Sequence, residues 1–183
     1  MSDLMSAAEN GFTDRVKSLI KTGVNIHSKD DDGYTALIFA ATEGHMDCVK
    51  ILIQAGANVN AKSNIGITAL MGAACGGHID CLVTLINARA DVDAKTDAGI
   101  TALMLAAREG HINCVNALIE KAANVNAKMD NGWTALILAK ADDHTDCVKA
   151  LIKAGAKSTD VVHPLSSSLG SAIGNAISTL LYG

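Results

Sequence analysis

The sequence repeats itself every 33 residues, and this period constrains the fold more than any other feature. The clearest ladder is formed by four glycines, Gly33, Gly66, Gly99 and Gly132. Threonine, histidine, cysteine and lysine follow the same step, starting at Thr35, His45, Cys48 and Lys29. One short unit cannot bury its apolar face alone, whereas stacked copies can. The period therefore predicts a solenoid.

Each unit is predicted to form a turn followed by two short helices. The stretch Asp-x-x-Gly that opens the first complete unit has turn chemistry, because glycine tolerates a positive φ. Thr35 is a good N-cap for a short apolar helix over 36–41, which Gly44 ends. A second helix is expected over 46–54, with its apolar residues on one face and Gly56 after it.

This pattern resembles the ankyrin repeat family, which follows roughly D-x-x-G-x-T-P-L-H-x-A-A-x-x-G-H. The stretch GYTALIFAATEGHMDCVKILIQAGANVNAK, residues 33–62, matches nearly throughout, and the stretches from Gly66, Gly99 and Gly132 match it too. The resemblance covers about residues 4–157 and implies an all-α ankyrin-repeat solenoid with β-turn fingers. The implied units are an N-terminal capping unit over 1–29 and four repeats over 30–62, 63–95, 96–128 and 129–157.

The sequence departs from the family pattern at several positions. Alanine replaces the proline that follows the capping threonine in every repeat, and alanine still favours a helix. Gly56 follows the second helix of its repeat. In the next two repeats, the equivalent positions are occupied by Arg89 and Ala122. If those sites are left-handed, each replacement costs roughly 1 kcal/mol. Asp143 replaces the glycine that precedes the repeated histidine.

A histidine and a cysteine three residues apart recur in every repeat, as in GHMDC, and raise the question of a metal or catalytic site. Zinc needs three or four ligands, and each repeat offers two. The resemblance instead implies that the histidine begins the second helix and hydrogen-bonds backbone between repeats. The cysteine then fills a small buried apolar position. The acidic stretch 141–147 around His144 is interpreted as a solvated helix junction.

No catalytic residue, metal or cofactor is predicted. Packed helices lie about 8–10 Å apart, which is too far for the ladder of cysteines to form disulfides. Cys75 lies outside that ladder, at the end of a first helix, and is expected to be exposed and the most reactive thiol. The net charge of −4 argues against a sequence-independent nucleic-acid binder, which needs a basic surface.

The expected location is the cytoplasm. The opening sequence MSDLMSAAEN does not look like a secretory signal, and five cysteines without such a signal indicate free thiols in a reducing compartment. The predicted function is a non-enzymatic protein–protein interaction scaffold that binds a partner protein through its concave face and turn tips. The alternative is a self-associating structural or assembly protein.

In the resembling family, variable binding residues flank the turn glycine and end the first helix. The candidate partner-binding residues are Asp31, Asp32, Tyr34, Thr42, Glu43, Asn64, Ile65, Ile67, Cys75, Asp97, Ile100, Arg108, Glu109, Asp130, Asn131, Trp133 and Asp142. The residues that follow each turn glycine are expected to form an exposed row of apolar side chains rimmed by acids. We call Tyr34, Ile67, Ile100 and Trp133 the tip row. Exposed Trp and Tyr are common hot spots, and the alternative is that these side chains fold back onto neighbouring turns.

The composition changes after Lys157. Residues 158–183 contain one charged residue, Asp160, and the only proline, Pro164. Apolar residues then recur every four positions, which predicts an amphipathic helix from about 165. Three roles remain open: capping of the last repeat, homo-oligomerisation through residues 165–182, or contact with a membrane. A span is not expected, because the segment is rich in serine.

Overall fold

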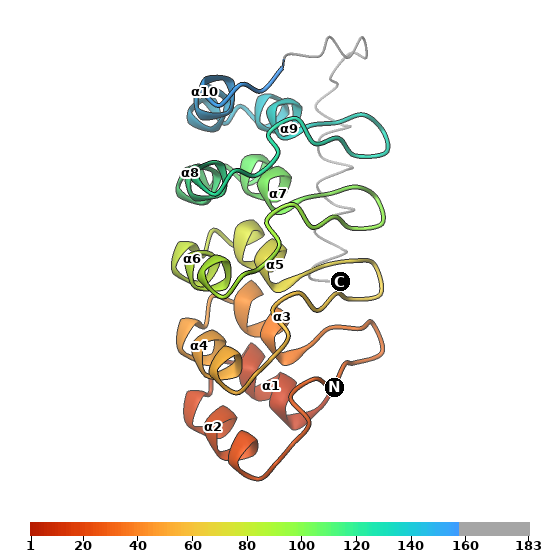
Figure 1. Ribbon diagram of the computed structural model, residues 1–183, viewed down its shortest axis with the longest axis vertical. Helices are drawn as coiled ribbons and strands as arrows, with labels where there is room; N and C mark the ends of the chain where they lie inside the picture. Colours follow the sequence, from red (N-terminus) through yellow and green to blue (C-terminus); the bar gives the residue numbers. More distant parts are fainter. Residues whose placement is uncertain (158–183) are drawn as a thin grey trace.

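The computed structural model describes residues 1–157, and in this part of the chain it shows ten helices stacked as pairs (Figure 1). The first helices of the pairs, which we call the inner helices, are α1 (Asp3–Glu9), α3 (Ala36–Thr42), α5 (Ala69–Cys75), α7 (Ala102–Arg108) and α9 (Ala135–Ala141). The outer helices are α2 (Thr13–Lys21), α4 (Met46–Gln54), α6 (Ile79–Asn87), α8 (Ile112–Glu120) and α10 (Thr145–Lys153). The predicted all-α repeat solenoid is therefore confirmed. The helix predicted from about 165 lies outside the described residues.

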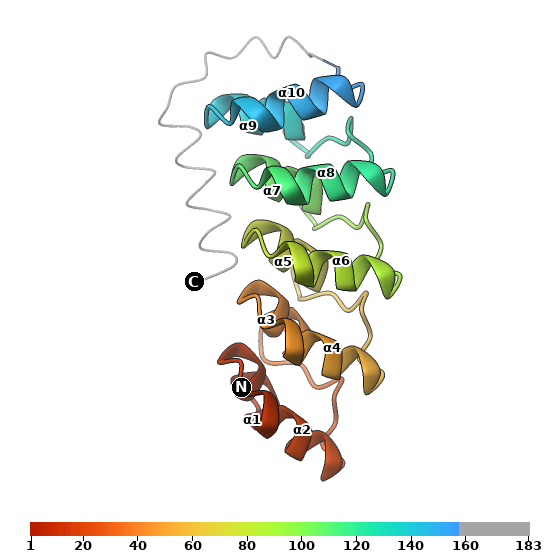
Figure 2. The same ribbon diagram turned by 90° about the vertical axis from the view of Figure 1, so that its left-hand side faces the viewer.

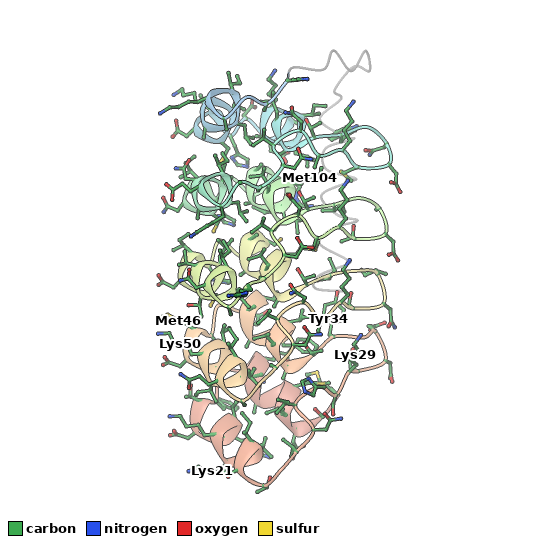
Figure 3. The ribbon with its side chains drawn as sticks, viewed as in Figure 1. Lys21, Lys29, Tyr34, Met46, Lys50 and Met104 are labelled. Carbon is green, nitrogen blue, oxygen red and sulfur yellow. The ribbon has the colours of Figure 1, made fainter. Side chains whose placement is uncertain are left out.

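The pairs stack in one direction, so that each inner helix packs against the inner helices before and after it (Figure 2). Four loops, which we call the fingers, project from the inner-helix side (Figure 1). The fingers comprise residues 30–34, 63–67, 96–100 and 129–133. Figure 3 shows Tyr34 and Lys29 on the finger side, and Met46 and Lys50 of α4 on the opposite side. The solenoid thus has an inner surface formed by fingers and inner helices, and an outer surface.

The inner helices begin at the predicted threonine caps. The hydroxyls of Thr35, Thr68, Thr101 and Thr134 each accept a hydrogen bond from the backbone N–H three residues later. Such a cap contributes about 1 kcal/mol to helix stability. The helices therefore form without the proline that the family pattern has at the next position.

The cysteine ladder lies in the core, as predicted. Cys48, Cys81, Cys114 and Cys147 are buried in the outer helices, and all five cysteines of the chain are free thiols. Burial raises the pKa of Cys81 and of Cys114 to about 11. Because the thiolate is the reactive form, these two thiols stay protonated and unreactive at neutral pH.

The repeated histidines connect successive helix pairs, as the resemblance implies. Nε2 of His45 lies 2.8 Å from the carbonyl oxygen of Glu9, and Nε2 of His111 lies 2.8 Å from that of Cys75. The histidine ring of each pair lies close to the glycine that precedes the histidine of the pair before it, which explains why Gly44, Gly77 and Gly110 are glycines. At Gly77, which has a φ of 71°, an added Cβ would lie 2.6 Å from Nδ1 of His111.

Asp143 occupies the position that corresponds to Gly77, in the last described helix pair, and there a side chain can be accommodated. Its φ is 58°, so the backbone is left-handed there without a glycine. Gly110, one period earlier, faces the ring of His144. One period after His144 the sequence has Ile177, so no fifth member of the histidine ladder opposes the Asp143 side chain. Within residues 1–157, no histidine ring of the ladder therefore adds to the backbone strain at Asp143.

Arg89 and Ala122 are left-handed, with φ values of 68° and 62°. At the equivalent Gly56, nothing lies within 4 Å of an added Cβ, so the replacements meet no steric clash. We expect Arg89→Gly and Ala122→Gly each to raise the free energy of unfolding by about 1–2 kcal/mol, as measured by urea denaturation. Ala88→Gly, at a helical φ of −81°, should lower it. A loss of stability in Arg89→Gly equal to that in Ala88→Gly would contradict this explanation.

Candidate functional site

The four fingers form one hydrogen-bonded surface along the inner side of the solenoid. The backbone N–H and the side-chain amide of Asn64 both donate to the preceding finger, to Asp32 and Asp31, at 2.8 Å. The backbone N–H of Asp97 donates to Ile65 at 3.2 Å, and a bond of the same length joins the third and fourth fingers. Each finger is therefore held by its neighbour, and the surface is ordered before any partner binds.

The expectation that the tip row is exposed is wrong for three of its four residues. Ile67, Ile100 and Trp133 are only 2%, 4% and 7% exposed, and Tyr34 is half-buried. In each finger the carbonyl of the tip-row residue accepts a hydrogen bond from the backbone N–H that opens the turn. This pairing places the row at the base of the fingers. The side chains fold back, which is the alternative given above.

Tyr34 shows how the row is held. Its ring centroid lies 5.6 Å from that of Phe39 on α3, which follows the same finger. Burial raises the pKa of the Tyr34 hydroxyl, and the neighbouring Asp32 and Asp30 raise it further. The Asp30 carboxylate accepts the backbone N–H of Tyr34 at 2.7 Å. Tyr34 is therefore a structural part of the finger base as well as a partly accessible side chain.

Three candidates at the ends of the inner helices are also buried. Thr42 donates its hydroxyl to the carbonyl of Ile38 at 3.0 Å. Cys75 is 5% exposed, so the expectation that its thiol is exposed is wrong. Arg108 is 6% exposed and forms an ion pair with Glu109, whose Oε1 lies 2.7 Å from the guanidinium Nε. These positions face neighbouring inner helices and fingers, and burial by those elements explains the difference.

The remaining candidates are accessible, and most of them are acidic. Ile65 is half-buried, whereas Asn64 and Asn131 are exposed. The exposed acids at the fingertips and at the inner-helix ends form a surface that we call the acidic rim. It comprises Asp31, Asp32, Asp97, Asp130, Glu43, Glu109 and Asp142.

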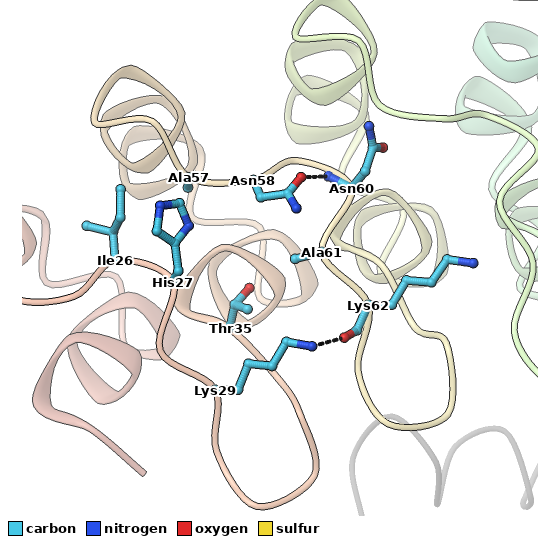
Figure 4. A pocket seen from close by; sticks show the side chains of 9 residues that line it. All are labelled: Ile26, His27, Lys29, Thr35, Ala57, Asn58, Asn60, Ala61 and Lys62. Carbon is cyan, nitrogen blue, oxygen red and sulfur yellow. Dashed lines mark hydrogen bonds between the residues drawn. The ribbon is translucent and has the colours of Figure 1, made fainter.

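The lysine ladder stabilises the stack. Lys29 donates its ammonium group to the carbonyl of Lys62 at 2.7 Å, and Lys62 donates to that of Lys95 at 3.2 Å. Figure 4 shows the bond between Lys29 and Lys62 beside a hollow of about 450 Å³, which lies between the loop residues 26–29 and 57–62. The residues that line this hollow include no carboxylate, cysteine or serine, and the Thr35 hydroxyl caps α3.

A second ladder of polar side chains joins neighbouring loops and was not predicted from the sequence. The side-chain oxygens of Asn60, Asp93 and Asn126 each accept a backbone N–H of the next loop at 2.8 Å. Their spacing of 33 residues was the available signal. Like the lysines, these side chains join neighbouring loops and are not free to contact a partner.

Within residues 1–157, no group of three or more histidine, cysteine, aspartate or glutamate side chains is placed to hold a metal ion. In the same range, no helix is long and apolar enough to span a membrane.

The comparison with known families agrees with the architecture. A family model described as ankyrin repeats in three copies matches residues 4–96 and 85–161. No curated protein sequence matches the chain significantly. The matched ranges include α2 to α10 and all of α1 except Asp3, and thus the capped inner helices and the histidine-linked outer helices. The chain therefore belongs to the ankyrin repeat family.

Proposed function

We propose that this protein is a non-enzymatic scaffold that binds a partner protein along its inner surface, through the acidic rim. Ankyrin repeats suggest a protein–protein interaction module. The observation that carries the proposal is the contrast between buried and exposed side chains. The apolar tip row is largely buried, whereas the seven rim carboxylates are exposed, four on fingers that hydrogen bonds hold in place and three at the ends of the inner helices.

The electrostatics of the rim favour a partner with basic groups. Exposed charges of one sign along a surface attract and orient partners of the opposite sign, and salt weakens this attraction. The Lys29 ammonium is directed at the neighbouring loop, and the Arg108 charge is paired with Glu109. The other rim carboxylates are therefore available to lysine or arginine side chains of a partner.

The chemistry of the described residues supports a binding role over a catalytic one. The Cys81 and Cys114 thiols are protonated at neutral pH. The His45 and His111 rings form hydrogen bonds to backbone carbonyls of the preceding helix pairs. We infer a cytoplasmic location, because five free cysteines suit a reducing compartment.

Neutralising the fingertip acids should weaken binding of a captured partner about tenfold or more, with a smaller dependence on salt. The rim variant is Asp31→Asn, Asp32→Asn, Asp97→Asn and Asp130→Asn. Exposed ion pairs contribute roughly 0.2–1 kcal/mol each, so that four lost attractions sum to a tenfold effect. Partners would be captured from native lysate, identified by mass spectrometry, and titrated calorimetrically.

The matched control removes four acids from the outer surface and changes the net charge equally. It is Asp47→Asn, Asp80→Asn, Glu120→Gln and Asp146→Asn, all at exposed positions of the outer helices. The control should bind within about twofold of the wild type. Equal losses in the two variants would mean that overall charge, and not the rim, determines binding.

A further inference from the structure

We propose that the segment 164–183 binds as a helix to the inner surface of its own solenoid, over a two-part site formed by an apolar hollow and Arg108. This inference does not depend on any external partner. It assigns an occupant to a part of the inner surface that lies between the finger bases and α7.

The hollow lies between the second and third fingers. It has a volume of about 180 Å³ and is lined by apolar groups of Ile65, Ile67, Ile100 and Leu105, together with parts of the third finger. Apolar cavities of about 150 Å³ are large enough to hold a benzene ring. The hollow is therefore large enough for a leucine or isoleucine side chain, and of the residues that line it only Asp97 is charged.

Arg108 lies one turn beyond Leu105 on α7, outside the lining of the hollow, and supplies the hydrogen-bond donor of the proposed site. Its Nε and Nη2 contact Glu109, but its Nη1 is buried and has no hydrogen-bond partner among the described residues. A buried donor without an acceptor is destabilising, and such groups in native proteins call for an explanation. A hydroxyl or carbonyl oxygen placed over Arg108 would satisfy Nη1.

The last described helix pair offers the segment an end that is more polar than the surfaces between pairs, with Ile152 of α10 as its exposed large apolar side chain, at 54%. At the position of Ala41, Ala74 and Ala107, the sequence has Lys140, which is exposed. At the first position of the outer helix, Thr145 replaces the apolar residue of the three preceding pairs and is also exposed. A polar end is what a terminal repeat requires for solubility. The hollow between the second and third fingers offers the apolar face of the segment a second apolar surface.

The composition of the segment suits the two-part site. Its apolar residues recur every four positions, at Leu165, Leu169, Ile173, Ile177 and Leu181. Residues 164–183 carry no charged side chain, so the acidic rim neither attracts nor repels them. Leucine and isoleucine match the hollow. In a helix, Ser166 lies on the same side as Leu169 and Ile173, and its hydroxyl can accept a hydrogen bond from Arg108.

The chain length is sufficient. In the preceding unit, the chain runs from Asn124, the equivalent of Lys157, to the finger glycine Gly132 in eight residues. A similar number of residues separates Lys157 from Leu165. A helix over 165–182 would be about 27 Å long, and packed helices are about 8–10 Å apart. It would therefore span about three helix pairs, and its covalent attachment gives an effective concentration of about millimolar.

A photo-crosslinker placed in the hollow tests the proposal in the full chain. Ile65, which is half-buried, would be replaced by p-benzoylphenylalanine, and the monomeric products would be mapped by mass spectrometry. We expect intramolecular cross-links to residues 165–182. Leu169→Asp with Ile173→Asp should reduce their yield at least fivefold, because two charges would enter the apolar interface.

The matched control is Ser171→Asp with Ser178→Asp, which adds the same charge to the opposite side of the predicted helix. Its yield should stay close to that of the parent protein. Cross-links found only in dimers would overturn the proposal in favour of a second copy as the occupant. The absence of cross-links to 165–182, or an equal loss in both variants, would also overturn it.

Discussion

Leu85→Ala is expected to lower the free energy of unfolding by about 2–5 kcal/mol, measured by urea denaturation. Leu85 is fully buried in α6, at the middle of the solenoid, where α6 packs against α4, α5 and α8. Removing a buried leucine loses the transfer free energy of its side chain and leaves a cavity that the neighbours only partly fill. Because each repeat is stabilised only by its neighbours, we also expect the two halves to unfold less cooperatively.

Val83→Ala is the matched control, since it shortens an apolar side chain on the same helix. Val83 is 39% exposed, so its truncation should change the free energy of unfolding by less than about 1 kcal/mol. Similar losses in the two variants would contradict the assignment of Leu85 to the stacked core.

Gly77→Ala is expected to cost about 2–4 kcal/mol, from two causes that act at one atom. The φ of 71° places the backbone in the left-handed region, which costs roughly 1–2 kcal/mol for a residue with a Cβ. The new Cβ would also lie 2.6 Å from the His111 ring. The ring must then move, and its hydrogen bond to the Cys75 carbonyl is strained or lost.

Gly56→Ala separates the two causes. Its φ is 92°, and nothing lies within 4 Å of an added Cβ, so it should lose only the backbone contribution of about 1–2 kcal/mol. In a His111→Ala background, the loss from Gly77→Ala should shrink to a similar value. Equal losses at Gly77 and Gly56 in the wild-type background would mean that the histidine contact adds nothing.

The stacked helices could be predicted because the relevant signals are local or periodic. Thr35 marks a helix start through a hydrogen bond to a residue three positions later, and the 33-residue ladder shows that units stack. The left-handed sites at Arg89 and Ala122 followed from the glycine at the equivalent Gly56. Each of these signals is found within one repeat or by comparing equivalent positions of the repeats.

The candidate site was harder to predict because accessibility depends on how the fingers close. The sequence places Ile67 immediately after a turn glycine, but it does not show that its carbonyl pairs with Ser63 and draws the side chain inward. Cys75 and Arg108 are buried for a related reason, since they end inner helices that face their neighbours. The fingertip acids, such as Asp97, lie beyond this pairing and remain exposed as expected.

Carboxyl footprinting of the complex with a captured partner tests the inner surface most directly. Carbodiimide with glycinamide would label exposed carboxylates, and mass spectrometry would compare each site with and without the partner. We predict that labelling falls at Asp31, Asp32, Asp97 and Asp130, and that it is unchanged at Asp47, Asp80 and Glu120 on the outer helices. Protection of the outer carboxylates with an unprotected acidic rim would contradict the proposed binding surface.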